Sequence, residues 1–336
     1  SVSLPPPRKP LPPHQLVLAP MVGGSELAFR LLARRHGAQL CYTPMIKSEE
    51  FNKKGGGVAL LERHVDDAPL GAHFSGNDAA TLLTVAKRAE RCPGIVAIDL
   101  NLGCPQRSAH SGHFGAFLCE PHDRPLLLSI VATCAKGLGI PFFCKIRLLD
   151  DLNETLEFAS QLEAAGCALL CVHARYRGSP MHRRDGPAHL DQVKLIKERL
   201  NIPVLANGNV RNASELLENL NTTGADGIMT AEGALDDPTI FRRALEESRN
   251  ERKALKAQVK EAAALKKVKK DGSKALTEEE RQLVKGRKAA KERLALLPKF
   301  EELAPLSIDK DNAAAASTSK ADGGFALAND YIELVT

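Results

Sequence analysis

The feature that most constrains the fold is a repeat of short apolar segments, each followed by a longer amphipathic stretch. Near-continuous hydrophobicity is typical of parallel strands buried on both faces, and the stretches between them can hold crossover helices. Eight such units in a row predict a (β/α)8 barrel, in the α/β class. A doubly wound open sheet is the competing interpretation, because periodicity does not show closure. The segments are LVLAPMV from Leu16, LCYTPMI from Leu40, LGAHFSG from Leu70, VAIDLNLG from Val96, PFFCKIRL from Pro141, LLCVHAR from Leu169, IPVLANGN from Ile202 and GIMTAEGA from Gly227.

The composition changes after this repeat. Between Arg249 and Arg293 there are 16 Lys/Arg against 7 Asp/Glu, an excess of 9 in a chain whose net charge is +5. Such a run either attracts nucleic acid phosphates or is a solvated helix face. The predicted domains are a Pro-rich tail (1–15), the barrel (16–245), a Lys/Arg-rich helical insertion (246–310), a flexible linker (311–324) and the start of a truncated C-terminal helical domain (325–336).

Several classes of protein are disfavoured. No apolar run approaches the roughly 20 residues that span a bilayer, and the opening SVSLPPPRKPLPPHQ lacks the apolar core of a signal peptide. The eight cysteines form no C-x-x-C pair, so we expect no metal site and a reducing compartment. We therefore expect a cytoplasmic protein, with the nucleus as a second location, and neither a membrane nor an obligate protein partner.

Polar residues follow the apolar segments at the positions where a barrel places its active site. The last two strand ends, NGNV and AEGAL, are small and Gly-rich, and loops at these positions of a barrel often bind phosphate through backbone N–H groups. This predicts a phosphorylated cofactor. The convergent residues are Pro20, Met21, His73, Asn101, Cys104, Lys145, Arg147, His173, Arg175, the run Asn207 to Asn209, Glu232 and Gly233.

Three of these residues suggest particular chemistry. Lys145 ends an apolar strand and should face an anionic or electron-rich group, although a solvated loop lysine and a Schiff-base lysine are alternatives. His173 is either a cofactor contact or a histidine bonded to backbone at the edge of the core. Cys104 lies between Gly103 and Pro105, so its thiol should project above the barrel as a proton donor or nucleophile rather than pack as a structural cysteine.

Seven ordered motifs carry a resemblance to a known family. They are APMVGGSELAFRLLARRHGAQLCYTPM, DLNLGCPQ, GHFGAFL, CKIR, VHAR, ANGNV and AEGALDDP, spanning about Leu16 to Leu245. In this order they resemble the FMN-dependent tRNA dihydrouridine synthases. DLNLGCPQ with GHFGAFL is most similar to the eukaryotic branch that acts on tRNA positions 16 and 17.

The resemblance implies a reaction and a role for each residue. NADPH, or NADH, would reduce FMN, which would pass hydride to C6 of a D-loop uridine of tRNA while Cys104 protonates C5. The implied FMN contacts are Pro20, Met21 and Val22 along the ring, His73 and Lys145 at its pyrimidine edge, His173, and Asn207, Gly208, Asn209, Ala231, Glu232 and Gly233 at the phosphate and ribityl end. The implied uridine contacts are Asn101, Arg147 and Arg175.

One departure from the family pattern keeps other functions open. The family usually has Gln where this chain has His73, and the two side chains differ in geometry and in response to pH. A flavin barrel acting on a free pyrimidine, like dihydropyrimidine or dihydroorotate dehydrogenases, is one alternative. An RNA-binding relative that has lost catalysis is another.

Overall fold

The computed structural model describes residues 9–53, 57–177, 186–271, 275–298 and 300. Parallel strands pair in the order β2-β1-β9-β8-β7-β6-β5-β4, and β2 also pairs with β4, which closes the ring. The predicted (β/α)8 barrel is confirmed and an open sheet is excluded, while the two-residue β3 adds an edge to β4. The strands are β1 (Leu16–Leu18), β2 (Leu40–Tyr42), β3 (Ile46–Lys47), β4 (Leu70–Ser75), β5 (Ile95–Leu102), β6 (Phe142–Leu148), β7 (Leu169–Tyr176), β8 (Val204–Asn207) and β9 (Gly227–Thr230).

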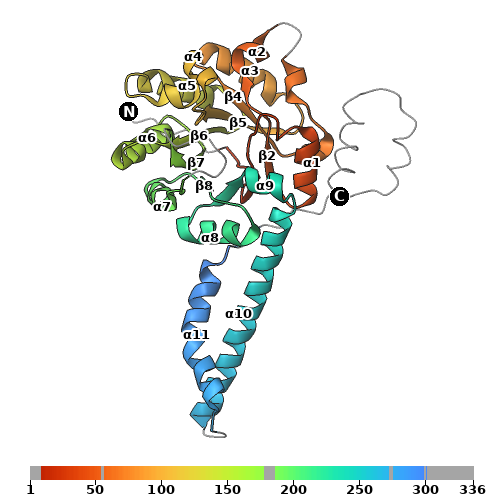
Figure 1. The fold of residues 1–336 in the computed structure, drawn as a ribbon, viewed down its shortest axis with the longest axis vertical. Coiled ribbons are helices and arrows are strands. Elements are labelled where there is room, and N and C mark those ends of the chain that lie inside the picture. The colour runs from red at the N-terminus through yellow and green to blue at the C-terminus, as the bar shows by residue number, and fades with distance from the viewer. Residues whose placement is uncertain (1–8, 54–56, 178–185, 272–274, 299, 301–336) are drawn as a thin grey trace, which may run out of the picture.

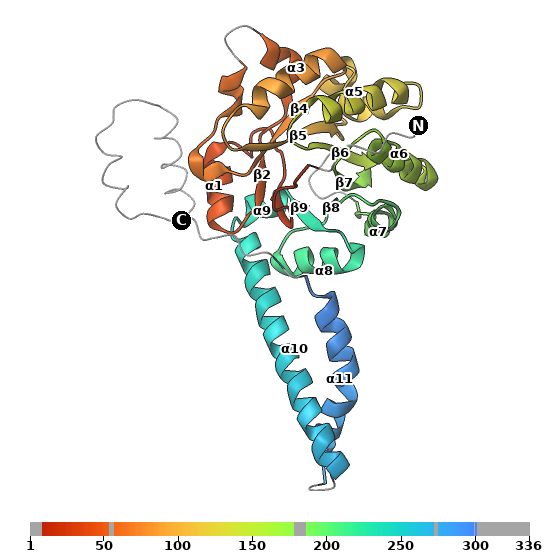
Figure 2. The same cartoon turned by 180° about the vertical axis from the view of Figure 1, so that it is seen from behind.

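Helices surround the barrel, and two long helices extend from it as an antiparallel hairpin (Figures 1 and 2). Side-chain caps start several of the surrounding helices: Asp78, Asp151 and Asn212 each accept a hydrogen bond from the backbone N–H three residues later. The helices are α1 (Leu27–Arg35), α2 (Ser48–Asn52), α3 (Ala79–Glu90), α4 (Arg107–Ser111), α5 (Arg124–Gly137), α6 (Leu152–Ala164), α7 (Leu190–Arg199), α8 (Ala213–Thr223), α9 (Glu232–Asp236), α10 (Ile240–Asp271) and α11 (Glu278–Leu296).

The apolar core has two parts that follow from the alternation of side chains along each strand. The larger part lies between the strands and the surrounding helices. The smaller part fills the inside of the barrel and includes Tyr42, Ala97, Phe143 and Leu169, all fully buried. Two or four residues further along β5, β6 and β7 the inward positions become polar, as at Asp99, Lys145 and His173, so the barrel floor is apolar and its mouth on this side is polar.

The hairpin is continuous with the barrel. Phe241 and Ala244, in the first turns of α10, are buried in the larger core cluster, and the helix then runs past residue 245 without a break. The division into domains at residues 245 and 310 stays a prediction. The predicted linker (311–324) and C-terminal segment (325–336), with the first eight residues of the tail, lie outside the described residues. Among the described helices, none is long and apolar enough to cross a membrane.

Candidate active site

A pocket of about 460 Å³ opens at the C-terminal ends of the strands β5 to β9. This volume lies within the range of sites that hold small molecules and cofactors. Strand alternation explains its polar lining, because residues two apart on one strand, such as His173 and Arg175 on β7, turn to the same side. The sequence-predicted residues that line it are Cys104, Arg147, His173, Arg175, Asn207, Gly208, Asn209, Ala231 and Glu232.

Positive charge dominates one side of this pocket. Lys145 lies inside the barrel and donates from Nζ to Asn207 Oδ1 at 3.1 Å, and burial lowers the pKa of its ammonium group. Burial, followed by the charges of Lys145, Arg147 and Arg175, holds the pKa of His173 well below its ordinary value. His173 is therefore neutral at pH 7, and its Nε2 lies 3.2 Å from Arg175 Nη1, in position to accept a hydrogen bond.

Two buried polar atoms in the pocket have no hydrogen-bond partner within the described chain. They are Nε of Arg175 and Oγ1 of Thr230. The other guanidinium nitrogens of Arg175 are engaged, one of them donating to Asn209 Oδ1 at 2.8 Å. Gly208 and Asn209 both have positive φ, at 119° and 53°, so the backbone after β8 takes the sharp turn typical of anion-binding loops. A cation set with unsatisfied donors beside such a turn fits a phosphate group.

The loop that carries Cys104 is held by two side chains, those of Asn101 and Arg147. Oδ1 of Asn101, on β5, accepts hydrogen bonds from the backbone N–H groups of Gly103 at 3.0 Å and Cys104 at 2.9 Å. Arg147 adds a bond from Nε to the carbonyl oxygen of Gly103 at 3.0 Å. The backbone of Gly115 packs so closely on this loop that an added Cβ would lie 2.9 Å from the Cys104 carbonyl oxygen. The thiol is thus placed at the pocket by a rigid turn.

His73 is buried beneath this loop rather than exposed on the pocket surface. It is 2% exposed, its Nδ1 contacts the Asp99 carboxylate, and its Nε2 lies 3.0 Å from Asn101 Nδ2. Both ring nitrogens are therefore occupied by the protein, and its predicted contact with flavin stays a prediction. Our sequence reasoning missed Asp99, although an acidic residue inside the apolar run VAIDLNLG is a signal that a buried partner must exist.

The pocket lining does not include every predicted residue. Pro20 and Met21 are partly buried just after β1, Val22 is 76% exposed, and Gly233 lies against the carbonyl of Val210. Lys145 does not line the pocket itself, but it donates a hydrogen bond to Asn207, which does. The lining residues that sequence reasoning missed are Pro105, Gln106, Gly186, Val210, Arg211, Met229 and Thr230. Arg211 directly follows the motif ANGNV, and that position was the available signal.

Fold and site together define a (β/α)8 barrel protein with a pocket lined by cationic side chains and a thiol at the C-terminal ends of its strands. The dihydrouridine synthase family model matches residues 17–321. The chain belongs to the dihydrouridine synthase family.

Two relatives and one solved structure illustrate the range of similar proteins. A mouse protein named tRNA-dihydrouridine(16/17) synthase [NAD(P)(+)]-like is 41% identical over 67% of this chain and 47% of its own length. A human tRNA-dihydrouridine(20a/20b) synthase [NAD(P)+]-like protein is 38% identical over 67% of this chain and 70% of its own. The chain spans about half the length of the former relative. A 2-naphthoyl-CoA reductase structure covers 69% of this chain and 50% of that one, with 10% identity and a TM-score of 0.55, and so shares the fold.

Proposed function

We propose that this chain is an FMN-dependent tRNA dihydrouridine synthase that uses NADPH or NADH to reduce D-loop uridines. Its family membership and its relatives' names support the reaction class. The observation that carries the proposal is the position of Cys104. Among the eight cysteines it alone is not buried, and it lines the same pocket as the cation set.

The residues of the pocket offer the cations and hydrogen-bond donors that suit FMN. Arg175, with its unsatisfied Nε, and the turn through Gly208 and Asn209 would hold the phosphate. Lys145 would face the electron-rich pyrimidine edge of the ring from inside the barrel, and Asn207 would orient that lysine. Pro20 and Met21 would flank the ring from the loop after β1, and Ala231 and Glu232 from the loop after β9.

A bound reduced flavin would supply a hydride to C6 of the uracil ring. The pair of electrons displaced from the C5=C6 bond then needs a proton at C5, and Cys104 would give it as the S–H bond breaks. Asn101 holds the loop in which that thiol lies, and Arg147 donates a hydrogen bond to Gly103 of the same loop. Arg147 and Arg175 would attract the RNA. The target uridine must leave its base stack to reach this pocket.

The favoured target positions are uridines 16 and 17. Relatives named for those positions are 38–41% identical to this chain, and relatives named for positions 20a and 20b are 34–38% identical. The motifs DLNLGCPQ and GHFGAFL support the first branch, and the position of the product in the RNA is the direct test.

The test is to incubate the full chain with FMN, NADPH and an unmodified tRNA transcript, then quantify and map dihydrouridine by mass spectrometry. We expect dihydrouridine at positions 16 and 17, and its loss in Cys104→Ala but not in Cys92→Ala, which truncates a buried thiol away from the pocket. A flavin-loaded protein that leaves tRNA unchanged refutes the proposal. Reduction of free uracil or orotate instead would assign the chain to the pyrimidine dehydrogenases.

A further inference from the structure

We propose that four lysines on the outer face of α10 form a contact site for the phosphate backbone of the RNA substrate, separate from the catalytic pocket. The inference rests on the proposed function for the identity of that RNA. The four residues, named here the lysine stripe, are Lys253, Lys256, Lys260 and Lys267, and all are exposed.

The spacing of these lysines aligns them along the helix. Intervals of three, four and seven residues place them within an arc of about 60° around the helix axis, over a length of about 21 Å. Ala262, which is fully buried, lies about 150° away from the centre of this arc. Because α10 packs along α11, the buried side marks the face toward α11, and the stripe points outward from the hairpin.

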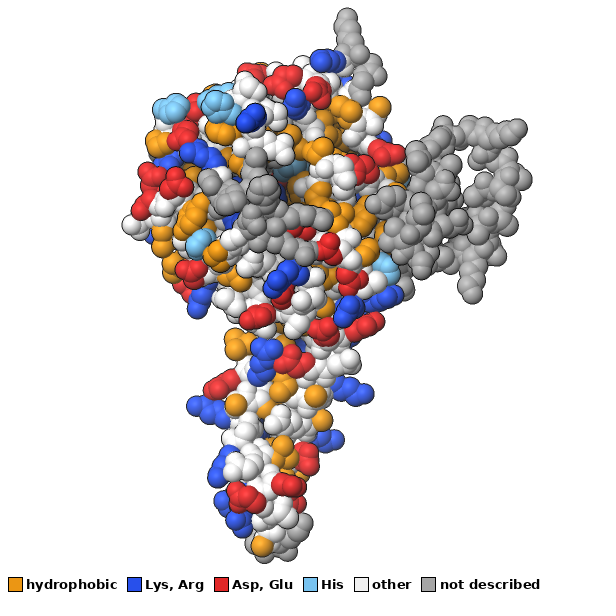
Figure 3. All heavy atoms as spheres, in the orientation of Figure 1, with side chains coloured by type: hydrophobic (Ala, Val, Ile, Leu, Met, Phe, Trp, Pro, Cys, Tyr) orange, Lys and Arg blue, Asp and Glu red, His pale blue; other side chains and the backbone are white. Residues whose placement is uncertain are grey.

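The stripe is electrostatically unbalanced. Residues 252–270 contain eight Lys/Arg and a single acidic residue, Glu261. Among the described side chains, none forms an ion pair with a stripe lysine, whereas on α11 Lys288 pairs with Glu292 and Arg281 with Glu278. Lys and Arg side chains are spread over the surface of the projecting hairpin (Figure 3). Uncompensated charges at this spacing suit a polyanion.

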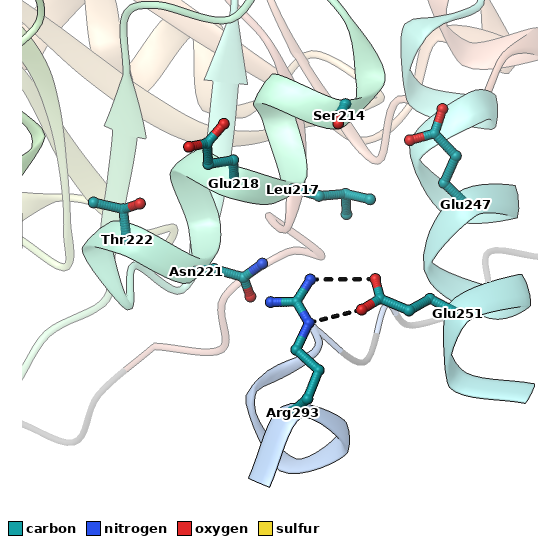
Figure 4. A pocket seen from close by; sticks show the side chains of 8 residues that line it. All are labelled: Ser214, Leu217, Glu218, Asn221, Thr222, Glu247, Glu251 and Arg293. Atoms are coloured by element: carbon teal, nitrogen blue, oxygen red, sulfur yellow. Dashed lines mark hydrogen bonds and ion pairs between the residues drawn. The ribbon is translucent and has the colours of Figure 1, made fainter. Parts of the chain in front are cut away.

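The helix that carries the stripe is braced at its base. Figure 4 shows where α8, α10 and α11 meet around a pocket of about 340 Å³. There Arg293 of α11 donates two hydrogen bonds to the Glu251 carboxylate, at 2.7 and 3.2 Å. Arg252 donates to the Leu297 carbonyl oxygen at 2.9 Å. A braced helix holds the backbone of its lysines in place, so a bound RNA has only their side chains to order.

The composition of α10 favours RNA over a membrane or a protein partner. A helix that lies on a membrane needs an exposed apolar face, and among the described residues no large hydrophobic side chain of α10 is exposed. Protein interfaces depend on aromatic anchors, and residues 249–293 contain no aromatic residue. What remains is sequence-independent attraction to phosphates, which suits a substrate recognised by its shape.

The test compares two triple variants of the full chain that remove the same charge. Lys253→Gln/Lys256→Gln/Lys260→Gln alters the stripe, and Lys285→Gln/Lys288→Gln/Lys291→Gln alters exposed lysines on α11. Binding of a fluorescent tRNA transcript is measured by anisotropy over a range of KCl concentrations, without NADPH. For the stripe variant we expect a plot of log K against log[KCl] that is shallower by about 2–3, and affinity near 0.1 M salt that is weaker by about tenfold or more. The control should change affinity by less than about threefold.

Four outcomes decide the inference and separate it from the proposed function. Equal losses in both variants would show general charge attraction and overturn it, provided circular dichroism shows unchanged helix content. Loss of binding to phosphatidylserine vesicles with unchanged tRNA binding would also overturn it, in favour of a membrane surface. If tRNA binding depends on the stripe but wild-type protein makes no dihydrouridine, the proposed function fails and the stripe stands. If dihydrouridine forms and the stripe variant binds like wild type, the function stands and the stripe fails.

Discussion

Replacing Asn101 by alanine tests how far this side chain holds the loop of Cys104 in place. The substitution removes the acceptor of two backbone hydrogen bonds, from Gly103 at 3.0 Å and Cys104 at 2.9 Å. Two such bonds contribute about 1–3 kcal/mol together, so the open population of the loop should rise by about 5- to 150-fold. Because Cys104 is already partly exposed in the closed loop, we expect its alkylation rate to rise by a smaller factor, about three- to tenfold.

The assay is alkylation by iodoacetamide near pH 8, followed by intact-mass spectrometry. Burial protects the other thiols and raises the pKa of Cys119, Cys134 and Cys171 to about 12, so only about one in 10⁴ of each is ionised at that pH. Alkylation of one fast-reacting site therefore reports on Cys104. Cys104→Ser should abolish the fast phase.

The matched control is Asn77→Ala. Asn77 likewise bonds the backbone through its side-chain amide, but as a donor to the carbonyl oxygens of Gly112 and His113, outside the loop of Cys104. In Asn77→Ala, Cys104 should be alkylated at the wild-type rate. If Asn101→Ala also reacts at the wild-type rate, the loop is held by other contacts, and our account of how the thiol is positioned is wrong.

Three further predictions concern charge, shape and cofactor. The folded barrel keeps His173 neutral, whereas the unfolded chain protonates it below about pH 6.5. The free energy of unfolding should therefore fall with acidification by up to about 1.4 kcal/mol per pH unit. In urea unfolding at several pH values, His173→Gln should lack this contribution to the pH dependence of stability. Gly115→Ala should destabilise the protein by at least about 1 kcal/mol more than Gly94→Ala. Both glycines have positive φ, but an added Cβ would lie 2.9 Å from the Cys104 carbonyl oxygen at Gly115 and 3.5 Å from the nearest atom at Gly94. Equal losses of stability would show that the close packing at Gly115 has no cost. Lys145→Met should weaken FMN binding by about 10- to 150-fold through loss of a charged hydrogen-bond donor, measured by flavin fluorescence, and unchanged affinity would remove Lys145 from the cofactor site.

The barrel could be predicted from the sequence because its signal is local. Each apolar segment and each amphipathic stretch can be identified from a few neighbouring residues. Eight such repeats in a row leave few ways for strands and helices to pack together. The side of the barrel that carries chemistry follows from the same pattern, so Cys104, His173 and Asn207 could be placed at the pocket. Their roles toward a ligand stay predictions.

The contacts inside the barrel depend on strand register, which the sequence does not reveal. His73 on β4 and Asp99 on β5 are direct register partners, as are Arg147 on β6 and His173 on β7. A shift of one residue between β4 and β5 would turn the carboxylate away from His73. The resemblance to the family marks His73 as a departure from the usual pattern, but only the register explains how an imidazole is accommodated there.

The cations of the pocket connect ligand binding to protonation. Lys145, Arg147 and Arg175 attract an anion and also lower the pKa of His173. A bound phosphate would offset part of that positive field, so His173 would accept a proton at a higher pH in the complex than in the free protein. Linkage makes the effect reciprocal, since protonation of His173 must strengthen phosphate binding by the same free energy. For an anion whose own charge is constant, affinity should therefore rise as the pH falls, whereas the stability of the free barrel declines, because one imidazole governs both.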